Sequence, residues 1–292
     1  MIFNKIKNKA DVEKWLIKMN IKNYTIHEDL SVDVKGNVFI NNKKLKEIPI
    51  QFNHVSGVFD CSYNNLKSLK GCPLSVGARF KCSYNKLTSL KFSPLIIHGD
   101  YDCAYNSLDS LEFCPTTITR TLDASHNKIK TLVYFPEKIG ESVFLAGNQI
   151  PKLENLPTII NGVLDLHDNH ILSMNGLPEY VHGFVNLSNN RITNFDNNSL
   201  LEANNLQIID NPLTNFLNFN IILTKQVFFD LKNFPKSTLD FIEKYKDDDI
   251  KIMEGSALAN NKIIDEIKRH EQNQKLDLNL SIKEKHTILK KI

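Results

Sequence analysis

The sequence lacks the motifs that identify most enzymes and the segments that identify membrane and secreted proteins. It contains no G-x-x-x-x-G-K-[ST], G-x-G-x-x-G, H-E-x-x-H or G-x-S-x-G pattern, so no known catalytic or phosphate-binding arrangement is indicated. No apolar run approaches the ~20 residues of a membrane-spanning helix, and the first residues lack the apolar segment of a signal peptide. We therefore expect a cytoplasmic, non-enzymatic protein with no membrane partner.

The sequence also lacks an evident cluster of metal ligands and a large net charge. The five cysteines include no C-x-x-C pair, which argues against a zinc site. Asp165, His167 and Asp168 are close enough in sequence to ligate a metal, but alternate strand residues with solvent between them are more often simply solvated. The net charge of +3 is too mild to indicate nucleic acid as a partner. We expect neither a cofactor nor a metal.

The dominant feature that is present is a repeat of 21 residues. It is marked by a series of asparagines: Asn64, Asn85, Asn106, Asn127, Asn148, Asn169, Asn190 and Asn211. Apolar residues recur before and after each asparagine, as in Phe59, Cys61, Leu66 and Leu69. Alternating apolar residues predict a short strand with one buried face, and stacked copies predict a parallel sheet with strands about 4.8 Å apart. The asparagine side chains are expected to bind turn backbone and form a ladder.

The repeat resembles the leucine-rich repeat, whose L-x-L-x-x-N-x-L core is matched by the segment from Leu164 to Ile171. Short repeats with Pro-x-x-Ile on the far side are similar to those of bacterial effector proteins. The string from Asp60 to Leu69 resembles, more specifically, leucine-rich repeat proteins encoded by large tailed bacteriophages. The resemblance implies an α/β solenoid with a curved parallel sheet.

The far side of each coil is predicted to be short, irregular and free of long helices. A proline stands nine residues after six of the asparagines, at Pro73, Pro94, Pro115, Pro136, Pro157 and Pro178. Because proline fixes φ and lacks an N–H, this side is expected to be extended or to form a single 3₁₀ turn. Cys61, Cys82 and Cys103 take inward positions in successive coils, too far apart for disulfides, so free buried thiols are expected.

Both ends of the array need a cap, because a solenoid exposes an apolar cross-section there. Residues 1–37 are predicted to form an N-terminal cap, with Asn8 capping a helix that buries Val12, Trp15 and Leu16. The array itself is assigned to residues 38–218. Residues 219–292 show helix signals around Leu239, Leu258 and Ile263, and are predicted to form a C-terminal helical cap or subdomain.

Function is expected on the concave surface, at strand positions that point away from the core. Asp102 and Asp123 should face each other on adjacent strands, a destabilising arrangement that Arg79 and Lys81 relieve on one side only. Beside them, apolar side chains are predicted to be exposed, as in the core of a protein interface. The candidate protein-binding residues are Asp100, Asp102, Asp123, Phe144, Val163, Asp165 and Phe184.

These residues favour a protein partner, and a basic one in particular, while an acidic hollow makes nucleic acid unlikely there. The phage resemblance implies an inhibitor or modulator of a host defence or nucleic-acid-processing protein, acting in the host cytoplasm. One alternative is a structural or assembly component of the phage particle. Another is nucleic-acid binding through a lysine-rich flank that includes Lys67, Lys86 and Lys128.

Overall fold

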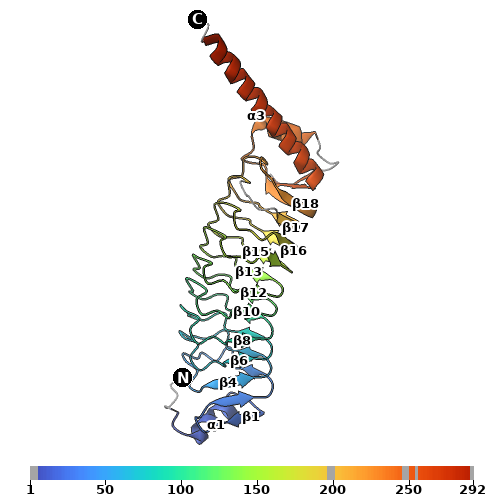
Figure 1. Ribbon diagram of the computed structural model, residues 1–292. Helices are drawn as coiled ribbons and strands as arrows, with labels where there is room; N and C mark the ends of the chain where they lie inside the picture. The colour runs from blue at the N-terminus through green and yellow to red at the C-terminus, as the bar shows by residue number, and fades with distance from the viewer. Residues whose placement is uncertain (1–5, 196–200, 245–249, 254–255, 290–292) are drawn as a thin grey trace.

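The chain forms a solenoid of stacked coils (Figure 1). This computed structural model describes residues 6–195, 201–244, 250–253 and 256–289. A cap that contains helix α1 (Lys9–Lys18) closes one end, and helix α3 (Asn261–Leu289) runs out from the other. The predicted parallel solenoid of the leucine-rich repeat type is thus confirmed at the level of a repeat solenoid.

A main sheet carries the strands that contain the alternating apolar residues of the repeat. Its parallel strands pair in register, coil on coil, as the 21-residue period requires. They are β3 (Val38–Phe39), β5 (Phe59–Asp60), β7 (Phe80–Lys81), β9 (Tyr101–Asp102), β11 (Leu122–Asp123), β13 (Val143–Phe144), β15 (Leu164–Asp165), β16 (Tyr180–Asn186), β17 (Leu201–Gln207) and β18 (Ile221–Asp230).

A second sheet runs along the neighbouring side of the solenoid, where the prolines occur. After two antiparallel strands of the cap, its strands pair in parallel from coil to coil. They are β1 (Tyr24–Ile26), β2 (Val32–Val34), β4 (Phe52–Val55), β6 (Ser75–Val76), β8 (Ile96–Ile97), β10 (Thr117–Ile118) and β12 (Lys138–Ile139); β14 (Ile159–Ile160) occupies the same place but pairs with β16. The far side, expected to be irregular, is therefore partly a regular sheet, and the expectation of extended backbone is confirmed.

A sharp corner separates the two strands of each coil. At Gly77 a side chain would overlap the carbonyl oxygen of Ser56 in the preceding coil, so only glycine lets the corners stack this closely. In β16 the two strands of the coil merge into one longer strand, which pairs with both β14 and β15. Its pairing with β17 shifts register between Val181 and Phe184.

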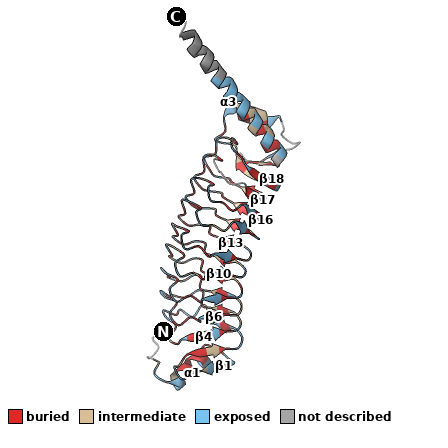
Figure 2. Ribbon diagram, in the orientation of Figure 1, coloured by how far each residue is buried: buried red, intermediate tan, exposed pale blue. Residues whose placement is uncertain are grey.

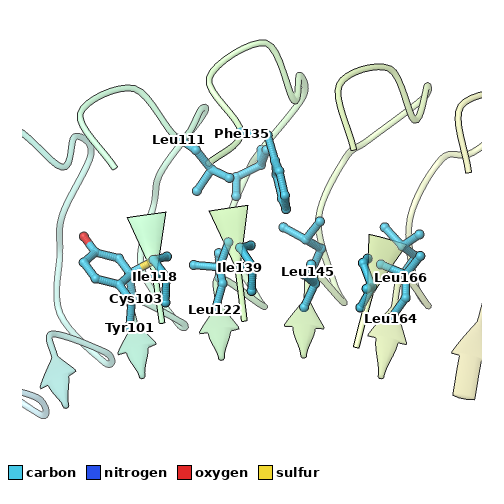
Figure 3. Packing of buried hydrophobic residues seen from close by; sticks show 14 of the residues in the cluster. Tyr101, Cys103, Leu111, Ile118, Leu122, Phe135, Ile139, Leu145, Leu164 and Leu166 are labelled. Atoms are coloured by element: carbon cyan, nitrogen blue, oxygen red, sulfur yellow. The ribbon is translucent and has the colours of Figure 1, made fainter. Parts of the chain in front are cut away.

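The core lies between the two sheets and the turns, and it is filled by inward residues of successive coils (Figures 2 and 3). The asparagine ladder forms as predicted. Asn127 Nδ2 donates to the carbonyl oxygen of Cys103 at 3.2 Å and to that of Ala124 at 3.1 Å, while its Oδ1 accepts the Leu108 N–H at 3.0 Å. Each such amide therefore joins two adjacent coils.

Beside this ladder, four rings stack along the surface. Tyr63, Tyr84, Tyr105 and His126 have centroid separations of 4.3, 4.2 and 4.3 Å. All four residues have φ between 52° and 54°, in the left-handed region. The four side chains thus pack against one another in continuous ring-on-ring contact.

The N-terminal cap agrees with the prediction. Asn8 accepts the Asp11 N–H at 3.0 Å, and Val12, Trp15 and Leu16 are buried. The C-terminal region, expected to be helical, contains α2 (Lys236–Glu243) and α3, but also strands β18, β19 (Ile250–Met253) and β20 (Ser256–Ala259). The main sheet thus continues beyond residue 218, where the array was predicted to end, and Leu258 lies on a strand and not on a helix.

Candidate functional site

The outward residues of the main sheet form one straight row, which we call the strand face. Pairing in register places Lys81 beside Asp102, Asp102 beside Asp123, and Asp123 beside Phe144. The row as a whole comprises Phe39, Asp60, Lys81, Asp102, Asp123, Phe144, Asp165, Asn186 and Gln207. The predicted opposition of Asp102 and Asp123 on adjacent strands is confirmed.

A hollow lies at the middle of the strand face. It is lined by Arg79, Lys81, Asp100, Tyr101, Asp102, Arg120, Thr121, Asp123 and Phe144. Four of the seven predicted site residues, namely Asp100, Asp102, Asp123 and Phe144, therefore meet in one place. Val163, Asp165 and Phe184 lie on the coils that follow and do not line the hollow.

Ion pairs relieve more of the acidic charge than the sequence suggested. Arg79 contacts Asp100 at 2.7 Å, and Lys81 Nζ lies 3.7 Å from Asp102. Arg120 Nε lies 3.6 Å from the same Asp100 and 3.1 Å from Glu141. Arg120 therefore adds a second cation at Asp100, whereas the Asp102–Asp123 pair has an ion-pair partner on one side only, as expected.

In the pair formed by Asp102 and Asp123, the negative charge is not fully balanced by neighbouring cations. Burial raises the pKa of Asp102, the adjacent Asp123 raises it further, and a hydrogen bond from Ser83 Oγ at 2.9 Å opposes the change. Asp123 accepts the backbone N–H of Ser125 at 3.0 Å. Among the ion pairs of the described residues none involves Asp123.

The apolar residues predicted to be exposed on and beside the strand face are less exposed than expected. Phe144, Val163 and Phe184 are all half-buried, so the prediction of openly exposed rings is only partly met. Phe39, at the first coil of the row, is the more exposed ring, with 51% of its surface accessible. Of these three predicted apolar residues, Phe144 is the one that lines the hollow beside its carboxylates.

Asp165, His167 and Asp168 form a small cluster of their own. His167 Nδ1 lies 2.7 Å from Asp165 Oδ1, and His167 Nε2 lies 3.7 Å from Asp168 Oδ2. Both carboxylates thus face the imidazole between them. In the part of the chain that the structure describes, no group of three or more such side chains is arranged to hold a metal ion.

Sequence analysis missed Arg120 and Glu141 because they stand at the corner before the strand and not on it. A signal was available: they are 21 residues apart, in a column otherwise filled by small residues such as Gly99 and Gly162. Opposite charges at the same position of adjacent coils predict a contact between them.

The lysine flank is present as a set of separate exposed side chains. Lys67, Lys86 and Lys128 are exposed and follow the asparagine ladder along one edge of the main sheet. No ion pair of the described residues includes them.

Comparison with known proteins adds no family to these observations: no protein-family model matches the chain, and no curated protein matches it. Among the described residues, no helix is both long and apolar enough to cross a membrane.

Proposed function

We propose that this solenoid is a non-enzymatic binding module that holds a protein partner on its strand face, centred on the hollow. The observation that carries the proposal is Asp123. Asp123 lies beside Asp102 on the adjacent strand, while the neighbouring cations form ion pairs with Asp100 and Asp102. Like charges in direct opposition destabilise a sheet, so folding alone does not account for the arrangement.

A partner side chain of opposite charge would remove this repulsion. A lysine or arginine inserted between Asp102 and Asp123 would also place its apolar stem against Phe144, which adjoins Asp123 in the register. Desolvated charge pairs beside an aromatic ring are typical of the most strongly contributing contacts in interfaces. We therefore propose a partner that presents a basic, partly apolar surface.

The phage resemblance extends this proposal to a host protein, such as a defence or nucleic-acid-processing enzyme, bound and modulated in the host cytoplasm. Repeat solenoids with similar faces are often used for protein binding. A fold does not define a function, so the partner must be identified by experiment.

The test is a capture experiment with immobilised protein and a bacterial lysate, followed by measurement of the affinity for the captured partner. Phe144→Ala should weaken binding by about 2 kcal/mol, and Asp123→Asn should slow association and reduce its dependence on salt. Phe39→Ala is the matched control, since Phe39 belongs to the same row but lies outside the hollow.

Three results would contradict the proposal. Equal effects of Phe39→Ala and Phe144→Ala would show that the hollow is not the centre of the interface. Loss of binding on mutation of Lys67, Lys86 and Lys128, with no effect of Asp123→Asn, would favour nucleic-acid binding. Capture of virion components alone would favour the structural alternative.

A further inference from the structure

A second surface, on another side of the solenoid from the strand face, contains a cavity of about 500 Å³. It lies where the turns lead into the second sheet, and its walls are mostly apolar. The lining residues that matter most are two phenylalanines, Phe92 and Phe113, and two leucines, Leu74 and Leu95, together with Cys114. The volume is within the usual range for small-molecule sites.

Phe92 and Phe113 adopt a backbone conformation that four other coils give to glycine or asparagine at this position. Phe92 has φ 70° and Phe113 has φ 68°, in the left-handed region that is costly for bulky side chains. Other coils place glycine or asparagine there: Gly71, Asn155, Gly176 and Asn218, with φ of 91°, 73°, 89° and 62°.

Burial does not compensate for this cost. Phe92 is 50% exposed and Phe113 is 52% exposed, and the two leucines of the lining are more exposed still, with Leu95 at 74%. Half-exposed rings on a strained backbone contribute little to the core. Strain that folding does not require is a mark of functional positions.

A positive charge lies beside Phe92, one of the lining residues. Lys91 Nζ lies 5.5 Å from the centroid of the Phe92 ring, and Lys70 holds the same position in the preceding coil. Neither lysine belongs to an ion pair among the described residues. Glu112 takes this position one coil further on, so this column of residues is positive at Lys70 and Lys91 and negative next to Phe113.

We infer that this cavity binds a small apolar carboxylate, such as a medium-chain acyl or aryl acid. The apolar part would lie among the phenylalanine and leucine side chains, and the carboxylate would meet Lys91 and Lys70. The apolar walls span three coils, a length of about 10 Å along the axis. This suits a small ligand better than a protein surface, which needs roughly 800 Å² on each partner.

The experiment is calorimetric titration of the full-length protein with dodecanoate, and with dodecanol as the uncharged arm. We expect saturable binding of one dodecanoate per chain. Lys91→Gln should weaken dodecanoate binding about threefold and leave dodecanol binding unchanged, since it removes one exposed charge contact.

Double substitution of Phe92→Asn and Phe113→Asn should reduce dodecanoate affinity at least about tenfold, because it removes two apolar side chains of the lining. The melting temperature should stay the same or rise, since asparagine is the residue found at this position in another coil. Val133→Asn is the matched control: Val133 is exposed and apolar but does not line the cavity, and its variant should bind as the wild type does.

Failure of dodecanoate to saturate, or unchanged affinity in the double variant, would overturn the inference. A fall in melting temperature with the double variant would assign the rings a structural role and also count against it. Leu95→Asn gives an independent check, because Leu95 is largely exposed and its replacement should weaken binding without unfolding the protein. These outcomes do not depend on the strand face.

Discussion

Glu271 places a carboxylate inside the contact between α3 and the end of the array. Only 7% of its surface is exposed. Its Oε2 accepts the backbone N–H of Phe216 at 2.7 Å, and its Oε1 accepts the Thr238 hydroxyl at 3.3 Å. Burial raises the pKa of Glu271 to about 7, against the lowering effect of these two hydrogen bonds.

The direction of the effect on stability follows from this pKa. Because the folded value lies above the ordinary 4.5 of the unfolded chain, the folded state binds the proton more tightly. The stabilisation is complete below about pH 4.5 and is lost as the pH rises through about 7. The difference in pKa corresponds to at most about 3 kcal/mol of unfolding free energy.

We expect the unfolding free energy, measured with urea and circular dichroism, to fall between about pH 5 and about pH 8 in the wild type. Glu271→Gln keeps an oxygen that can accept the Phe216 N–H but cannot ionise. The variant should therefore show a flatter pH profile and should exceed the wild type in stability at the higher pH. Asp265→Asn is the control, because Asp265 is exposed on the same helix.

The comparison of variants isolates this one group from every other titrating residue. If Glu271→Gln and the wild type lose stability in parallel as the pH rises, the buried carboxylate does not titrate near neutrality. The proposed cost of burying its charge would then be wrong.

Three further predictions concern the array. Asn127→Ala should cost about 1 to 3 kcal/mol, because it leaves the buried Leu108 N–H without its acceptor, and an unchanged melting temperature would contradict the ladder. Thiol titration after denaturation should find all five cysteines free; fewer would reveal a disulfide that this geometry does not contain. Gly147→Ala should lower the melting temperature, since φ is 66° and the new methyl carbon would lie 2.5 Å from Nδ1 of His126; an unchanged ring stack and stability would contradict that expectation.

The strand face could be predicted in full because one period governs it. Once Asp102 and Asp123 are 21 residues apart at outward strand positions, parallel pairing leaves no other arrangement. The second sheet could not be predicted in the same way. A strand as short as Ser75–Val76 contributes a single buried residue, so no alternation is visible in the sequence.

The other differences arise where the period ends or where the backbone turns. In the coil that contains β18, Lys232 follows the strand and stands where the period would place the next asparagine. The coil was therefore not recognised, although its strand buries Ile221, Leu223, Val227 and Phe229. Phe92 and Phe113 lie seven residues after an asparagine, in a turn. The alternation of apolar and polar residues predicts which way a side chain points in a strand, but not in a turn. The residues that line the cavity were therefore not predicted.

The hydrogen bonds that join the Asn127 side chain to Cys103 and Leu108 of the preceding coil have a consequence for the evolution of the gene. Each coil bonds to the coils directly before and after it, and those neighbours present nearly the same backbone groups. Recombination that removes or duplicates one whole coil would therefore rejoin the ladder without exposing the core. It would move the hollow about 4.8 Å relative to one cap. Inheritance in whole coils lets the spacing between binding surfaces vary while the fold is retained.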